Sequence, residues 1–368
     1  MRQNTKTIFE LDENQKKRLQ DAILEGKKPE VLLFRILGPQ LQERFAELLD
    51  LSQVPRLLLH GNPHLDNYAR TYNGAGLLDF DRSRVGPSLW DVSRALSSIT
   101  FWSAGDDLRP HTELVDCFFS SYIRAIEDRL VYWEVPDFLR KVKPKKFQLS
   151  PKKYLNSGKK WVKKFKDNLV DTDLEFYNGL FQAYLQTLPR GSLVHWRIKE
   201  VAEVAGSMGK KHYVYWLKPN LKTREAILLD IKETYSEKDN EYFSNPFKQE
   251  GERMVTASRL YSPGLEEGIG YCHYQKKDYW VRQIPTFSVK VPVGIIHDEA
   301  MQLAQEIGIQ LGRGHRVIDE VYNQGQAKQD LIDTLNNNRM ALIDACEHLN
   351  QEVIFSYDHY STQFKSKS

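Results

Sequence analysis

The sequence predicts an α+β fold with two lobes. Three observations support this prediction. Apolar residues recur at helical spacing through residues 1–60, and an apolar–polar–apolar pattern over residues 60–94 indicates a hairpin. Residues 196–284 alternate short apolar runs with turns, which is typical of strands. A chain of 368 residues is long enough for one large or two modest domains, each with its own core.

The hairpin is expected to present polar side chains at its open end. An apolar run at 57–59 precedes the polar loop, Asn73-Gly74 provides a turn signal, and a second apolar pair at 77–78 follows. That pair leads directly into an acidic sequence at 79–81. The polar loop and the acidic end should therefore lie close together.

This layout predicts metal and nucleotide binding. Mg²⁺ prefers hard oxygen ligands and is held by one or two carboxylates together with phosphates and water. Asn67 and Asp79 are the right residue types for such a site. Phosphoryl-transfer sites also place a loop aspartate five residues before the metal-binding asparagine. That position is Asn62 here, which is an amide and cannot act as a base.

Three nearby side chains can replace the missing base. They are His64, Asp66 and Asp81. On a strand, Asp81 would face the same side as Asp79, because the two are two residues apart. Loss of the acid at position 62 would lower the rate without removing nucleotide binding.

Three short motifs resemble the catalytic core of aminoglycoside and choline phosphotransferase-like kinases. They are HGNPHLDN at 60–67, LDFD at 78–81 and GPSLWD at 86–91. The resemblance implies a protein-kinase-like two-lobed fold that uses ATP and Mg²⁺. It implies Asn67 and Asp79 as the metal ligands and Asp91 as a buried support for the catalytic loop. Asn62 departs from the aspartate of the related motif.

The glycine turn and the strands after it match the order of a kinase small lobe. Gly206, Ser207 and Gly209 would let backbone amides approach phosphates, and Lys232 at a strand end would pair with the α- and β-phosphates. A tight hairpin turn and a surface lysine would explain these residues equally well if each stood alone. Their occurrence in the expected order carries the interpretation.

A helix over residues 246–261 carries two candidate partners for Lys232. They are Glu250 and Glu252, and helical phase does not decide between them. Gln283, at the end of a later strand, is placed to offer backbone contacts to adenine.

The small lobe therefore follows the catalytic loop, which predicts a circularly permuted kinase-like fold. We expect a large helical lobe at 1–190 with the catalytic hairpin, a β-rich nucleotide-binding lobe at 191–284, and helices at 285–368 that return to the large lobe. Short motifs between residues 28 and 315 resemble, in this order, the bacterial family called domain of unknown function 2252. That resemblance implies a relation to kinases and supplies no activity.

A basic segment at 140–166 contains twelve lysines or arginines and no acidic residue. Aromatic residues interleave with the charges. A solvated face with the aromatics packed beneath is the preferred interpretation, followed by a surface for a phosphate-bearing substrate and then by one for nucleic acid. A formal charge of +3 does not by itself favour nucleic acid.

The remaining composition predicts a soluble cytoplasmic protein. No apolar run approaches the length of a membrane span, and the three cysteines form no CxxC pair. We therefore expect an ATP- and Mg²⁺-dependent phosphotransferase that acts on a small molecule or a protein, with no membrane partner. The second interpretation is a nucleotide-binding pseudokinase with a regulatory or scaffolding role. The third is a kinase-derived fold that binds no nucleotide and only supports contacts with partners.

Overall fold

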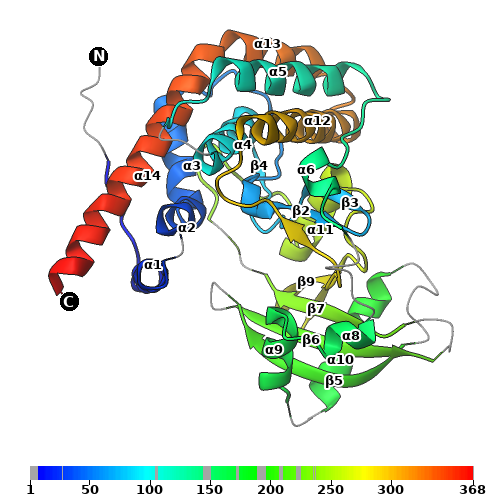
Figure 1. The fold of residues 1–368 in the computed structure, drawn as a ribbon. Helices are drawn as coiled ribbons and strands as arrows, with labels where there is room; N and C mark the ends of the chain where they lie inside the picture. Colours follow the sequence, from blue (N-terminus) through cyan, green and yellow to red (C-terminus); the bar gives the residue numbers. More distant parts are fainter. Residues whose placement is uncertain are drawn as a thin grey trace.

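A mostly helical large lobe and a smaller lobe built on one antiparallel sheet make up the molecule (Figure 1). The computed structural model describes residues 7–26, 28–103, 107–143, 151–170, 174–188, 196–206, 210–220, 225–234, 236 and 238–367. Each lobe has its own hydrophobic core.

The large lobe packs around α4, whose residues are all buried. The helices of this lobe are α1 (Glu13–Leu24), α2 (Pro29–Ile36), α3 (Gly38–Leu48), α4 (Leu89–Trp102), α5 (Thr112–Glu127), α6 (Asp137–Arg140), α12 (His297–Tyr322), α13 (Lys328–Asn337) and α14 (Arg339–Lys367). Trp90 and Trp102 of α4 are almost fully buried and anchor this core. The described part of residues 1–60 contains the three helices α1, α2 and α3, as predicted, before β1 begins at Arg56. Helix α14 packs against α2, α3 and α4 (Figure 1).

The strands of the large lobe pair differently from the prediction. They are β1 (Arg56–Leu58), β2 (Tyr68–Thr71), β3 (Gly74–Leu77), β4 (Val85–Pro87) and β10 (Val289–Lys290). The turn at Asn73 does join a hairpin, β2–β3, but the first apolar run forms β1 and pairs with β4 instead. β10 adds to the other edge of β2. The polar loop therefore lies between two small sheets.

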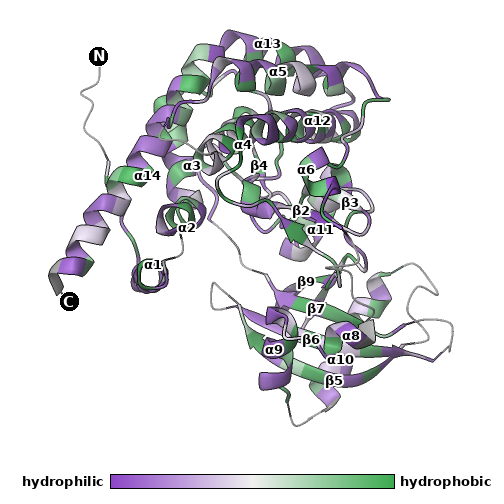
Figure 2. Cartoon of the chain, viewed as in Figure 1, coloured by the Kyte–Doolittle hydropathy of each residue, from purple (hydrophilic) through white to green (hydrophobic). Residues whose placement is uncertain are grey.

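The small lobe is a five-stranded antiparallel sheet. Its strands are β5 (Trp196–Ala205), β6 (Lys211–Pro219), β7 (Ile227–Glu233), β8 (Gly270–Tyr274) and β9 (Lys277–Gln283), in the order β5-β6-β7-β9-β8. In Figure 2 these strands carry much of the hydrophobic colour of the lobe. The predicted strands of this region are thus present.

Helices cover both faces of this sheet. One face packs against α10 (Leu174–Thr187), and the other packs against α8 (Pro151–Leu155) and α9 (Lys160–Asp167). These helices lie before residue 190 in the chain but pack on the sheet of the small lobe. They therefore do not belong to the large helical lobe that the sequence predicted for residues 1–190. Buried Tyr154 and Phe165 explain the difference, because they fill the sheet's core rather than the large lobe's.

A single helix, α11 (Glu250–Tyr261), connects the two lobes. It contacts β8 and β9 of the small lobe, while its residues Ala257 and Tyr261 belong to the core of the large lobe. None of the helices in the described ranges is long and apolar enough to cross a membrane. The three cysteines are unpaired.

Candidate active site

The loop after β1 is held by the carboxylate of Asp91, in the first turn of α4. Its two oxygens accept the backbone N–H groups of His60 and Gly61 at 2.8 and 2.9 Å. The Trp90 indole donates to the carbonyl of Gly61 at 2.8 Å. Gly61 has a φ of +84°, and a Cβ there would lie 1.9 Å from the carbonyl of Arg82, so only glycine fits. The structure thus gives Asp91 the supporting position that the sequence predicted.

Behind Asp91 lies a fully buried histidine of α12. His315 Nε2 is 3.4 Å from the Asp91 carboxylate, and the hydroxyl of Tyr261 is also 3.4 Å from it. Tyr122 bonds the other ring nitrogen of His315. Helices α5, α11 and α12 therefore all help to orient the one carboxylate that holds the loop.

Asn62 is buried beside an arginine. Its side-chain oxygen accepts a hydrogen bond of 2.9 Å from Nε of Arg94, whose Nη2 donates to the carbonyl of Phe34. The guanidinium lies 3.9 Å from the centre of the Phe34 ring. Burial lowers the pKa of Arg94, and the nearby charges of Arg82 and Arg35 lower it further. Within the described residues no carboxylate bonds to Arg94, so an amide stands where an aspartate would form an ion pair.

Asn67 and Asp79 are brought to the same place by backbone pairing. The Leu78 N–H donates to the carbonyl of Asn67 at 2.8 Å. The side chain of Asn67 donates to the carbonyl of Asn62 at 3.2 Å. Asp79 has a φ of +68°, which is uncommon for a residue other than glycine and is enriched at functional sites. The predicted metal ligands thus lie at one end of the β2–β3 hairpin.

Lys232 of the small lobe forms an ion pair with Asp81 of the large lobe. Burial alone would raise the pKa of Asp79, but Lys232 and Arg282 outweigh burial and lower it. Burial and the Asp79 charge raise the pKa of Asp81, and Lys232 offsets part of that rise. The charge of Lys232 therefore acts on both carboxylates, and only Asp81 forms an ion pair with it.

This group fits the ligands that Mg²⁺ prefers. Asp79 and Asp81 each have a buried Oδ1 without a hydrogen-bond partner in the described structure, and Asn67 adds an amide oxygen. Across the ranges that the structure covers, no cluster of three His, Cys, Asp or Glu side chains forms a protein-only metal site. One or two carboxylates completed by phosphates and water is the usual arrangement for Mg²⁺ with a nucleotide.

The predicted partner of Lys232 on the connecting helix is not observed. The carboxylate of Glu250 accepts from Nε of Arg253 at 2.9 Å, and no ion pair of Glu252 occurs among the described residues. Arg253 also donates to the carbonyl of Asp81 at 3.1 Å. Helix α11 therefore contacts the acidic segment 79–81 through Arg253. Asp81, and neither Glu250 nor Glu252, forms the ion pair with Lys232. Arg253 was not among the predicted site residues, although it lies directly between the two lobes.

The glycine turn is only partly described. Gly206 closes the β5–β6 connection by donating its N–H to the carbonyl of Lys210 at 2.8 Å. A Cβ at this glycine would lie 2.8 Å from both that carbonyl and Nε2 of His212. Ser207 and Gly209 lie outside the described residues.

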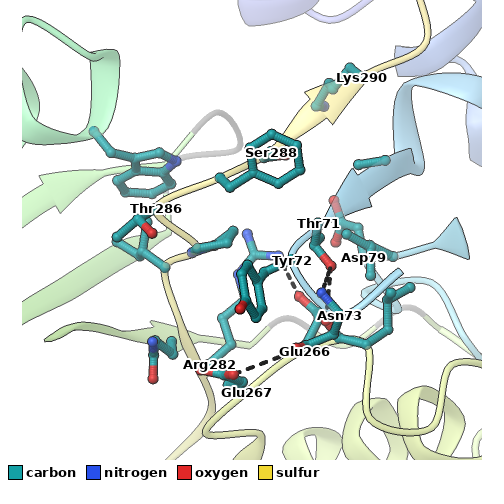
Figure 3. Close-up of a pocket in the computed structure, with 18 of the residues that line it drawn as sticks. Thr71, Tyr72, Asn73, Asp79, Glu266, Glu267, Arg282, Thr286, Ser288 and Lys290 are labelled. Atoms are coloured by element: carbon teal, nitrogen blue, oxygen red, sulfur yellow. Dashed lines mark hydrogen bonds and ion pairs between the residues drawn. The ribbon is translucent and has the colours of Figure 1, made fainter. Parts of the chain in front are cut away.

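Two cavities meet at Asn67 and Asp79. The first, of about 620 Å³, lies between the β2–β3 hairpin and the segment that follows β9 (Figure 3). In Figure 3 Asp79 lies on one side of this cavity and Thr286 on the opposite side. The second cavity, of about 560 Å³, is lined by Asn62 and Lys232. The two cavities also share Lys160, Trp161, Arg282 and Lys290 as lining residues.

Gln283 does not offer its N–H to the first cavity as expected. That N–H donates to the carbonyl of Glu267 at 2.8 Å. The neighbouring Arg282 binds Glu266 at 2.9 Å on the floor of the cavity (Figure 3). Backbone contacts to a purine would have to come from other atoms of the 283–288 segment.

The predicted replacement bases are each engaged or neutral. Asp66 forms ion pairs of 2.8 Å with Arg35 and 3.1 Å with Lys290. Asp81 is bound to Lys232. Burial lowers the pKa of His64 well below its usual range, helped by the surrounding cations, so its imidazole is neutral. Of the three, only the neutral His64 has no salt-bridge partner in the described ranges.

The basic segment forms part of the wall between the lobes. Tyr154 and Phe165 are buried against the sheet, as the preferred interpretation of the segment requires. Lys160 and Trp161 line both cavities. Residues 144–150 of this segment lie outside the described residues.

Comparison with known families gives a class and then a family. Residues 5–118, which contain the loop after β1 and Asp91, match a family model described as a phosphotransferase enzyme family. Residues 143–363 match the model of a family described as an uncharacterized protein conserved in bacteria (DUF2252). That match covers more than half of the chain, so the protein belongs to this family. No curated protein and no solved structure matches the chain.

Proposed function

We propose that the protein is an ATP- and Mg²⁺-dependent phosphotransferase of kinase type. The observation that carries this proposal is the meeting of Lys232 from the small lobe with Asp79 and Asp81 from the large lobe. A lysine and paired acidic groups at a cleft between two lobes are what nucleotide phosphates and their metal require. The phosphotransferase match of residues 5–118 supports the same class.

In this proposal each side chain has a separate task. Asn67 and Asp79 hold the metal, which neutralises charge on the phosphates when it is bound. Lys232 leaves Asp81 in part to bind phosphate oxygens, and the backbone at Gly206 covers them. The first cavity takes the base, with Trp161 and the 283–288 segment as its walls.

We also propose that the order of the lobes is a circular permutation. The strands that would hold the nucleotide follow the catalytic loop in the chain, and α12 returns to the large lobe after them. α12 packs extensively on α5 and α4, so it completes the core that the first hundred residues begin. The cytoplasm is the expected location, which fits the three unpaired cysteines.

A nucleotide-binding pseudokinase is the second candidate. The Asn62–Arg94 hydrogen bond favours it, because the position of the base is occupied by an amide held at 2.9 Å. Phosphoryl transfer depends mainly on positioning and charge stabilisation, so this change alone does not exclude catalysis. An active phosphotransferase would turn over ATP and a pseudokinase would not, whereas both would bind the nucleotide.

Thermal unfolding with and without Mg²⁺-ATP tests the proposal. A ligand at one hundred times its dissociation constant stabilises the folded state by about 2.7 kcal/mol. We expect a magnesium-dependent shift in the native chain and none in Asp79→Ala. Loss of radiolabelled γ-phosphate from ATP then separates the two candidates. If neither ATP nor GTP shifts the native chain, the protein is no nucleotide-dependent enzyme.

A further inference from the structure

The second cavity carries more positive charge than its acidic groups balance. Nine of its lining residues are lysine or arginine, and three are aspartate. A magnesium-bound nucleotide offsets only part of this excess, because the metal cancels part of the phosphate charge. A second anion at the same place would account for the remainder.

Two of the nine cations lie on the side formed by α1 and α2, where Asp12 is the one acidic residue that lines the cavity. Arg18 of α1 and Arg35 of α2 line this cavity together with Asn62 and His64. In Figure 1 these two helices lie at the lower left of the large lobe. Lys232, which belongs to the nucleotide side, comes from the opposite wall.

Arg18 and Arg35 have few acidic neighbours: the charge of Asp12 acts on Arg18, and Asp66 forms an ion pair with Arg35. Arg18 makes no hydrogen bond or ion pair within the described residues, although it is half-buried. Burial lowers its pKa, and the charge of Arg35 lowers it further. Arg35 shares its one carboxylate, Asp66, with Lys290, and its buried Nε has no partner in the described structure. Two neighbouring cations that are partly removed from water indicate an anion site.

We propose that Arg18 and Arg35 bind a phosphate group of the acceptor, so that the acceptor is a small phosphate-bearing molecule with a free hydroxyl. A phosphate monoester carries about −2 at neutral pH and accepts the forked hydrogen bonds of arginine. A cavity of about 560 Å³ is of the size that holds small molecules. This inference deepens the proposed function and depends on it for the role as acceptor.

The reaction at this site balances as follows. The acceptor hydroxyl oxygen forms a bond to the γ-phosphorus of ATP, and the bond from that phosphorus to the β–γ bridging oxygen breaks. ADP leaves with the electron pair of the broken bond, and the hydroxyl proton passes to water in the cleft. The phosphate held by Arg18 and Arg35 is not changed; it positions the hydroxyl beside Asn62.

Calorimetric titration with fructose 1,6-bisphosphate tests this assignment, with fructose as the uncharged comparison. The full chain is titrated both alone and saturated with Mg²⁺ and a non-hydrolysable ATP analogue. The variant Arg18→Gln removes one charge from the cavity. Lys17→Gln is the matched control, because it removes the same charge from the adjacent, exposed position of α1.

We expect the bisphosphate to bind the nucleotide-saturated chain and fructose not to bind. Arg18→Gln should weaken bisphosphate binding by about ten-fold or more, the range of one charge-assisted hydrogen bond, and leave the analogue's affinity unchanged. Lys17→Gln should bind as the native chain does. The inference is overturned if the analogue displaces the bisphosphate, if the bisphosphate does not bind, or if the two variants behave alike.

The titration also separates this inference from the proposed function. If the analogue does not bind but the bisphosphate binds to the chain alone in an Arg18-dependent way, the nucleotide proposal fails and the anion site stands. If the analogue binds and the bisphosphate does not, the anion site fails and the nucleotide proposal stands.

Discussion

The two sides of the candidate active site differ in how their charges are balanced. On one side Asn62, a neutral amide, is held by the buried cation Arg94. On the other side two carboxylates, Asp79 and Asp81, lie beside the cations Lys232 and Arg282. The first side places a cation against a neutral amide, whereas the second side places carboxylates against cations. In the proposed function nucleotide and metal would bind at the second side, so the loss of an acid from the first would not affect their binding.

This difference also separates positioning from proton transfer. The loop that carries Asn62 remains anchored by Asp91, which holds two consecutive backbone N–H groups. A loop that kept its support after losing its base would still orient a phosphate acceptor. In the inference above, the cations near Asn62 bind an anionic group of the acceptor.

The largest expected effect is on the anchor of the loop. Asp91→Ala should lower the free energy of unfolding by about 4 kcal/mol, because several buried groups lose a charged partner. Urea denaturation of this variant beside Glu43→Ala, an exposed acid of α3, measures the effect. The control should change by less than about 0.5 kcal/mol. A loss below about 1 kcal/mol for Asp91→Ala would show that the loop does not depend on this carboxylate.

Removing the lysine tests the second side. Lys232→Met should weaken binding of Mg²⁺-ATP by about one hundred-fold, since a charge-assisted contact to phosphate is lost. Lys211→Met is the control, because Lys211 is exposed on the adjacent strand and pairs with Glu203. Its affinity should stay native. Equal affinities in the two variants would place the nucleotide phosphates elsewhere.

The loop should also respond to pH through His60. Burial lowers the pKa of His60 from 6.5 to about 4. Between pH 6.5 and 5 the unfolded state takes up a proton at this residue and the folded state does not, so the protein loses stability as pH falls. The expected loss is about 2 kcal/mol at pH 5. Denaturation at pH 7 and pH 5 should show a smaller loss for His60→Gln, whereas identical losses would contradict a buried neutral His60.

The smallest expected effect comes from restoring the acid. Asn62→Asp should raise turnover by about ten-fold or less, although a well-placed base contributes on the order of 10²–10⁴-fold. The reason is Arg94, which would form an ion pair with the new carboxylate and lower its pKa. Phosphate release with the best acceptor, compared with Asn62→Ala, measures this. No gain over Asn62→Ala would mean that position 62 does not act on the proton.

Much of the local structure follows from sequence patterns, whereas the contacts between lobes do not. The strands of the small lobe were predictable because their apolar runs are separated by turns, and Asp91 was predictable from its motif. The partner of Lys232 was not, since Asp81 and Glu250 are both acidic residues near the cleft. The choice depends on Arg253, which binds Glu250 and leaves Asp81 to the lysine.

Other parts of the site had a weaker signal. Arg94 lies one helical turn after Asp91 on α4, so it faces the same loop. The residues next to Arg94 in the sequence do not indicate that its hydrogen-bond partner is the amide of Asn62. The pairing of β1 with β4 was missed because two apolar runs closer in sequence offered a simpler hairpin. Local pattern indicates which strands exist, and burial in the assembled core decides which of them pair.

Calorimetric binding of Mg²⁺-ATP to the native chain, Asn62→Asp and Asp79→Ala tests the separation of the two sides most directly. The native chain and Asn62→Asp should bind Mg²⁺-ATP with affinities within about three-fold of each other, because the substitution at Asn62 does not touch the side proposed to hold the phosphates. Asp79→Ala should show no magnesium-dependent binding. Failure of the native chain to bind, or native affinity in Asp79→Ala, would contradict the assignment of nucleotide binding to this cleft.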